Sequence, residues 1–112
     1  MAQPFKIAFH EKNGKSDVRD YIESLETKKK AKIYYMLELL RQRGWQMKYP
    51  DTEKVGDKVF ALRVEYGNNE YRFFYFFHSR EIILFVHYVH KKSKKLRPED
   101  IEKAERIRKE YL

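Results

Sequence analysis

The sequence predicts a single α+β domain with the element order β-αα-βββ-α. Two stretches with helical spacing lie in the first half of the chain, and three aromatic-rich strand patterns follow one another in the second half. A length of 112 residues is enough for one hydrophobic core but not for two, so we expect one domain over residues 1–112. The helical pair should cover one face of a small, mostly antiparallel sheet and leave the other face partly open.

The first half of the chain begins with a strand pattern and continues with two helical patterns. FKIAFH (5–10) alternates apolar and polar residues, which is typical of a half-buried strand. Ser16 is placed to cap a helix whose apolar residues between 18 and 25 fall at i, i+3, i+4 and i+7. A second helix is expected from about 27 to 43, ended by Gly44. The short break between the two helices predicts an antiparallel hairpin.

The second half is expected to form a loop, three strands and a last helix. Residues 45–58 show no clean period and contain Pro50 and Gly56, so they are predicted to form a loop. The patterns VFALRVEYG, EYRFFYFF and EIILFVHYVH are separated by short turns, which favour antiparallel neighbours. Pro98 opens the last helix, which has one narrow apolar stripe. That stripe is formed by Ile101, Ala104, Ile107 and Tyr111.

The charge of the chain favours a polyanionic partner. The formal net charge is +8 and the pI is near 9.6. Residues 98–112 hold five acids and four bases, so the remaining residues carry a charge of +9. The alternative is a basic surface that is simply solvated. No apolar stretch is long enough to span a membrane, and no hydrophobic signal core is present, so we expect a soluble, cytoplasmic protein.

Neither a metal site nor a cofactor is expected. The chain has no cysteine, which excludes disulfides and thiolate catalysis. Its four histidines show no HExxH or clustered ligand spacing, and His87 and His90 should point to opposite faces of a strand. No phosphate-binding glycine loop or nucleophile elbow is present.

Two arginines within the strand patterns are the strongest candidates for a functional site. If the first two of these strands pair across the turn at 66–70, Arg63 and Arg72 can lie close together on one face. Guanidinium groups hold phosphate oxygens with two parallel hydrogen bonds. The cationic run HKKSKKLR (90–97) follows the last strand and could act in the same groove. The structural alternatives are ion pairs of Arg63 with Glu65 and of Arg72 with Glu70, and a solvated linker at 90–97.

An ordered set of motifs resembles the RelE/ParE toxin superfamily, and within it the HigB-like, phage-derived branch. The matching segments are VFALR (59–63), EYRFFYFF (70–77), IILFVHYVHKKSKK (82–95) and PEDIEKAERIRKEYL (98–112). The resemblance implies a RelE-like fold and a type II toxin that enters the ribosome and cleaves mRNA without a metal, leaving a 2′,3′-cyclic phosphate. It also implies a cognate antitoxin, often of the helix-turn-helix type, as a partner.

The resemblance also implies roles for individual residues. Arg63 and Arg72 would hold the scissile phosphate and stabilise its developing charge. The basic segment would orient RNA and support proton transfer. The catalytic set is then Arg63, Arg72, His90, Lys92 and Tyr111, and the RNA-binding set is Lys91, Lys94, Lys95 and Arg97.

Two other functions are compatible with the same residues. One is a ParE-like toxin that poisons a topoisomerase through protein contacts. The other is a basic module that binds RNA, or only an antitoxin, without cleaving anything. Mapped mRNA ends after induced expression would separate these alternatives from an endoribonuclease.

Overall fold

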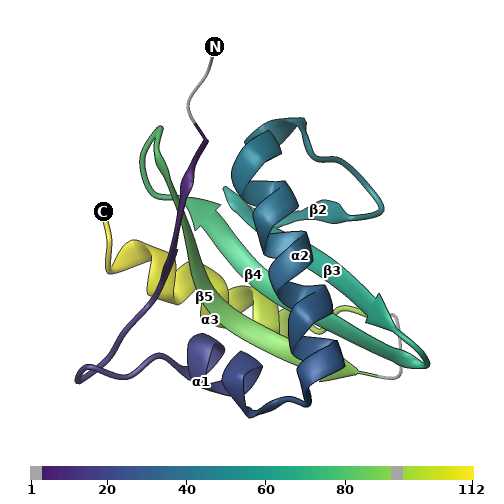
Figure 1. Ribbon diagram of the computed structural model, residues 1–112. Coiled ribbons are helices and arrows are strands. Elements are labelled where there is room, and N and C mark those ends of the chain that lie inside the picture. The colour runs from purple at the N-terminus through teal and green to yellow at the C-terminus, as the bar shows by residue number, and fades with distance from the viewer. Residues whose placement is uncertain (1–3, 92–94) are drawn as a thin grey trace.

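The computed structural model describes residues 4–91 and 95–112, and its elements follow the predicted order with one strand added (Figure 1). A short strand is followed by a helical hairpin, a single 3₁₀ turn, four strands and a last helix. The elements are β1 (Lys6–Phe9), α1 (Asp17–Ser24), α2 (Thr27–Arg43), η1 (Gly44–Gln46), β2 (Thr52–Gly56), β3 (Val59–Tyr66), β4 (Asn69–Phe77), β5 (Ile82–Lys91) and α3 (Pro98–Lys109).

The strands form one sheet in the order β1-β5-β4-β3-β2. β1 runs parallel to β5, and all other neighbours are antiparallel, as the short turns predicted. The prediction that residues 45–58 form a loop was wrong for β2, which pairs with β3 at the edge of the sheet. Its sequence TEKVG has no clear alternation, and its pairing is irregular between Lys54 and Gly56. A short edge strand of this kind has little signal in the sequence.

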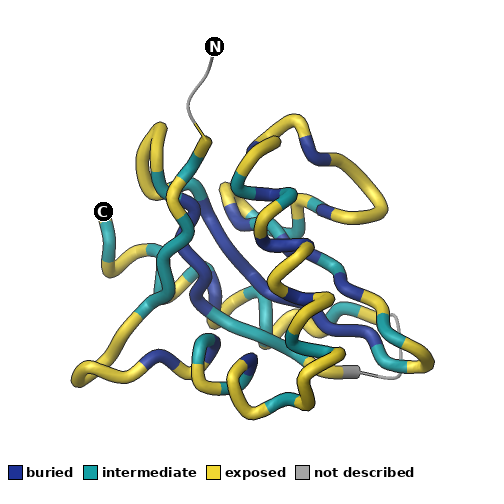
Figure 2. The backbone as a smooth tube through the Cα atoms, viewed as in Figure 1, coloured by how far each residue is buried: buried dark blue, intermediate teal, exposed yellow. Residues whose placement is uncertain are grey.

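Helices cover both faces of the sheet (Figure 1). α1 and α2 pack on one face, the hairpin face, where Ile22, Ile33 and Leu40 meet Phe73 and Phe85 of the strands. α3 packs on the other face, the α3 face, and buries a second cluster around Phe74 and Ala104. The expectation of a partly open face was therefore wrong over this cluster, because the apolar stripe of α3 covers it. Figure 2 shows the buried residues concentrated along the central strands.

The ends of the helices have the capping residues that the sequence indicates. Ser16 is the N-cap of α1, and its hydroxyl accepts a hydrogen bond from the backbone of Arg19 at 3.2 Å. Gly44 ends α2 with a φ of 53°, a conformation that favours glycine. Pro98 lies in the first turn of α3, together with acidic residues that suit the positive end of the helix dipole.

A β-bulge in β5 decides which residues of this strand face which helices. Phe74 pairs with His87 but Tyr75 pairs with Phe85, so Val86 is an extra residue in β5. Beyond the bulge, His87 and Val89 lie on the α3 face, whereas Tyr88 and His90 lie on the hairpin face. The prediction that His87 and His90 point to opposite faces is therefore confirmed.

Candidate functional site

Arg63 of β3 and Arg72 of β4 face each other across the sheet. They are direct register partners in the antiparallel pair, so their side chains leave the same face about 5 Å apart at Cβ. That face is the one covered by α3, since Arg63 shares it with Ala61 and Arg72 with Phe74. The prediction that the two arginines share one face is confirmed.

A single carboxylate, that of Glu70, joins the two arginines. Nη2 and Nε of Arg63 donate to Oε1 of Glu70 at 2.6 and 3.1 Å, and Nη2 of Arg72 donates to Oε2 at 3.1 Å. The side chains are only 11% exposed for Arg63, 5% for Arg72 and 8% for Glu70. The hydrogen bonds to Glu70 raise the pKa of Arg63 above its ordinary value. We call these three residues the arginine network.

Both ion pairs that the sequence offered as structural alternatives are present at the arginine network. Arg72 pairs with Glu70, and Arg63 lies 3.7 Å from Glu65, although its closer partner is Glu70. Arg72 is buried. The two arginines are balanced by Glu70 within the network and by the exposed Glu65 beside it, so a phosphate that binds here has to compete with Glu70 for the guanidinium groups. The more exposed of the two arginines is Arg63, whose guanidinium lies 5.8 Å from the ring of the exposed Tyr49.

His90 does not share the face of the arginine network. Its side chain lies on the hairpin face, stacked on Tyr71 with 4.6 Å between ring centroids, and its Nε2 is 2.8 Å from Oδ1 of Asn69. A catalytic role for His90 in contact with Arg63 and Arg72 would require it to act around the edge of β5. The structure therefore separates the predicted imidazole from the predicted phosphate clamp.

His87 is the imidazole on the same face as the arginines. It lies two residues before Val89, the register partner of Arg72, so His87 and Arg72 are diagonal neighbours on the sheet. Its Nε2 is 2.8 Å from Oδ1 of Asp100 in the first turn of α3, and burial is the main cause that lowers its pKa below the ordinary value. Sequence reasoning missed this pair because the strand pattern does not show on which face a bulged strand places each residue.

Tyr111 lies at the far end of the α3 face. It follows α3, its hydroxyl is hydrogen-bonded to Nδ1 of His10 at 2.7 Å, and its ring lies 5.3 Å from that of His78. Six residues of extended chain, about 20 Å, separate His78 from Arg72. Burial is the main cause that raises the pKa of Tyr111. The structure does not bring this predicted catalytic residue to the arginines.

The basic segment after β5 begins beside the arginine network. The backbone of Lys91 is the register partner of Glu70, which brings the start of the segment to the same end of the sheet. Lys92 and Lys94 lie outside the described residues. Lys95 and Arg97 are exposed, and Arg97 forms an ion pair with Glu99 at 2.9 Å. The predicted RNA-binding segment therefore adjoins the predicted phosphate clamp.

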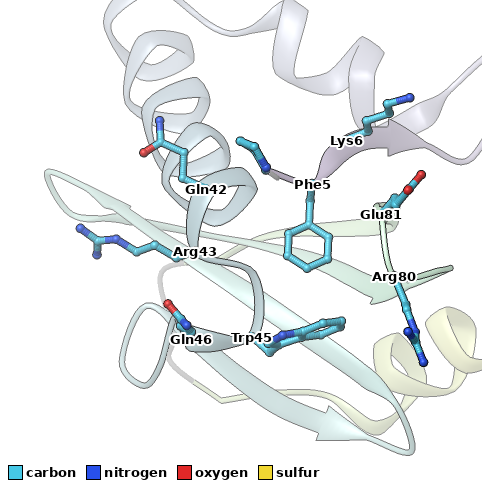
Figure 3. A pocket seen from close by; sticks show the side chains of 9 residues that line it. Phe5, Lys6, Gln42, Arg43, Trp45, Gln46, Arg80 and Glu81 are labelled. Atoms are coloured by element: carbon cyan, nitrogen blue, oxygen red, sulfur yellow. The ribbon is translucent and has the colours of Figure 1, made fainter. Parts of the chain in front are cut away.

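A separate hollow lies where β1 meets the end of α2. It has a volume of about 580 Å³, and Figure 3 shows the ring of Phe5 pointing toward Trp45, with Arg43 and Arg80 on opposite sides. Phe5 and Trp45 pack edge to face at 5.0 Å, and both contact Phe77 at the end of β4. This hollow lies at the opposite end of β4 from Arg72. The packing of these aromatic side chains stabilises the start of the edge strand β1 against the rest of the fold.

Two kinds of site have no support in the part of the chain that the structure describes. Residues 4–91 and 95–112 contain no group of three or more histidine, aspartate or glutamate side chains placed to hold a metal ion. No helix formed by the same residues has the length and apolar character needed to cross a membrane.

The comparison with protein families gives a match over most of the chain. Residues 20–109 match the family described as phage-derived Gp49-like proteins (DUF891). The chain belongs to this family. Membership of this family fits a toxin of a toxin–antitoxin system, and a toxin of this kind has an antitoxin as its partner. A comparison with curated proteins gives no significant match. Membership of the RelE/ParE superfamily itself stays a prediction for this Gp49-like chain.

Proposed function

We propose that this Gp49-like protein is the toxin of a type II toxin–antitoxin system and cleaves mRNA on the ribosome. The observation that carries the proposal is the direct pairing of Arg63 with Arg72 on one face, at the end of the sheet where the basic segment begins. Two fixed guanidinium groups are suited to hold the oxygens of one phosphodiester and to stabilise the charge that develops on it.

The reaction that fits these groups is an internal transesterification of RNA. The 2′-oxygen attacks the adjacent phosphorus as its proton passes to a base, the bond from phosphorus to the 5′-oxygen breaks, and that oxygen takes up a proton. The products are a 2′,3′-cyclic phosphate and a 5′-hydroxyl. In the resting protein Glu70 holds both arginines in place, and the phosphate replaces part of its contacts when RNA binds.

His87 is the group best placed for proton transfer among the described residues. It is a neighbour of Arg72 on the α3 face, and its lowered pKa leaves the imidazole neutral and able to accept a proton near pH 7. Asp100 fixes the orientation of the ring. His90 and Lys92 remain predictions for the same role, and Tyr111 would need a large movement to reach the site. The ribosome contributes by positioning the mRNA codon.

The test is induced expression with mRNA ends mapped across the transcriptome. The variant Arg63→Lys/Arg72→Lys keeps both positive charges beside Glu70 but loses the paired hydrogen bonds to phosphate, so we expect growth arrest and cleavage to fall by at least about 100-fold. The matched control is Arg19→Lys/Arg41→Lys, which changes two partly exposed arginines of the helical hairpin and should leave toxicity unchanged. Undiminished cleavage by the Arg63/Arg72 variant would overturn the proposal.

The same experiment separates the alternatives. Intact mRNA together with a DNA-damage response would indicate a topoisomerase poison of the ParE type. Salt-sensitive RNA binding without cleavage in a translating extract would indicate a non-catalytic module. The bridging carboxylate of Glu70 is the observation that favours this last alternative, because it already binds both guanidinium groups that a scissile phosphate would need.

A further inference from the structure

A second groove lies along the edge of β5, between α3 and the loop at residues 10–17. β1 ends at Phe9 and pairs with β5 only as far as Phe85, so within residues 4–91 and 95–112 no strand lies beside the rest of β5 on that edge. The chain leaves β1, turns through Lys12–Lys15 and enters α1, while α3 crosses the neighbouring face (Figure 1). The hollow between them has a volume of about 840 Å³, and its floor is formed by Val86, His87 and Tyr88.

Cationic side chains stand on both sides of this groove. Lys12 and Lys15 come from the loop, and Lys103 and Arg106 come from one turn of α3. All four residues are exposed, and among the described residues none of them takes part in an ion pair. The acidic residues of the lining are Asp17 and Glu110, so the groove keeps an excess of two positive charges.

These four cations are distinguished by their position on two facing walls of one hollow, because exposed lysines elsewhere, such as Lys28 and Lys32 of α2, also have no ion pair among the described residues. Other cations of the helical hairpin are neutralised locally: Arg19, Lys30 and Arg41 each have a glutamate within 3.4 Å. Cations that line two opposite walls without acidic partners repel one another, and an anion between the walls removes that repulsion. The arrangement therefore favours a negatively charged ligand in the groove.

We propose that this β5–α3 groove binds the phosphate backbone of RNA. The choice of RNA rests on the proposed function, and the preference for an extended chain rests on the geometry. Four cations around a hollow of this size exceed what one phosphate needs, but they suit successive phosphates of a strand. His87 lies in the floor of the groove and is also the diagonal neighbour of Arg72. The floor of the groove is therefore next to Arg72 on the sheet.

The binding experiment needs neither the ribosome nor cleavage. The purified full-length chain is titrated into a fluorescent 2′-O-methyl RNA oligonucleotide, which has no free 2′-hydroxyl, at several salt concentrations. Lys103→Ala/Arg106→Ala removes two phosphate contacts, so the slope of log K against log[salt] should fall by about 1.4, with affinity about 10-fold weaker at low salt. Lys12→Ala/Lys15→Ala, on the other wall and outside any helix, should give the same change.

The matched control is Lys28→Ala/Lys32→Ala, which removes two exposed charges from α2. Equal losses in this control and in the groove variants would mean that only net charge matters, and would overturn the proposal. Saturable binding of inorganic phosphate or ATP in the groove, with RNA affinity unaffected by the groove variants, would overturn it in favour of a small anion.

The groove and the proposed function can fail separately. Weaker RNA binding by the groove variants, in a protein that cleaves no mRNA, would support the groove and remove the endoribonuclease. Full cleavage and unchanged RNA binding by the groove variants would support the endoribonuclease and overturn the groove.

Discussion

Replacing Glu70 with glutamine tests the arginine network most directly. The substitution keeps the shape of the side chain but removes the charge that faces two guanidinium groups at 2.6 and 3.1 Å. Breaking a buried ion pair by removing one partner costs about 3–5 kcal/mol of unfolding free energy. We expect the lower end, about 3 kcal/mol, because the amide oxygen still accepts one hydrogen bond and Glu65 lies 3.7 Å from Arg63.

For a chain of 112 residues this loss corresponds to a melting temperature about 12 °C lower. The measurement is thermal and urea unfolding of Glu70→Gln beside Glu65→Gln. Glu65 is 64% exposed, so its substitution should change the unfolding free energy by less than about 1 kcal/mol.

Phosphate should restore part of the lost stability of Glu70→Gln. With Glu70 neutral, no carboxylate bridges the two arginines, which is the arrangement that an inorganic phosphate ion can occupy. If phosphate binds this variant with a Kd near 1 mM, about 100 mM phosphate should return about 2.7 kcal/mol relative to sodium chloride of equal ionic strength. A Glu70→Gln protein as stable as Glu65→Gln, or one that phosphate does not stabilise, would refute the idea that the arginine network is a phosphate site.

Three further changes test other parts of the structure. Burial lowers the pKa of His87, so the unfolded chain binds a proton more readily than the folded chain. The free energy of unfolding should therefore be highest above about pH 6.5 and should fall as the pH drops below that value. Urea unfolding at pH 7.5 and 5 measures this fall, which should be smaller in His87→Gln. Gly44→Ala places a methyl group against the ring of Phe5 at a φ of 53° and should lower the free energy of unfolding by about 3 kcal/mol. The control Gly67→Ala, at a φ of 61° with open space around it, should lower it by about 1 kcal/mol. Similar melting temperatures for the two variants would contradict the packing of Phe5. Ser16→Ala removes the buried N-cap of α1 and should lower the free energy of urea unfolding by about 1 kcal/mol. Ser24→Ala, at the exposed end of the same helix, is the control. An equal effect of both substitutions would argue against the cap.

The order of the elements could be predicted because local signals agree with the fold. Ser16, Gly44 and Pro98 mark helix ends, and the aromatic strands alternate clearly enough to place Arg63 and Arg72 on one face. β2 could not be predicted in the same way, since a five-residue edge strand depends on its partner β3 rather than on its own pattern.

The candidate site was predictable only in part. Alternation along a strand places a residue on a face, but it does not show which carboxylate reaches an arginine: the sequence suggests a pair of Glu70 with Arg72 alone, whereas Glu70 also binds Arg63. Long-range contacts such as that of Tyr111 with His10 depend on where α3 crosses the sheet. The four cations of the β5–α3 groove come from segments that are about 90 residues apart, so no local motif joins them.

The extra residue Val86 sets the phase of β5 relative to β4. Had the same sequence paired without the bulge, the regular register from Tyr75 and Phe85 onward would put His90 opposite Glu70 and His87 opposite Phe73, and the two imidazoles would exchange faces. A relative that is shorter by one residue at this point would keep His87 beside the arginines with an unbroken ladder. Among relatives, the number of residues in β5 between the position of Phe85 and the histidine therefore decides whether that histidine faces the arginines. The presence of a histidine in this strand does not decide it.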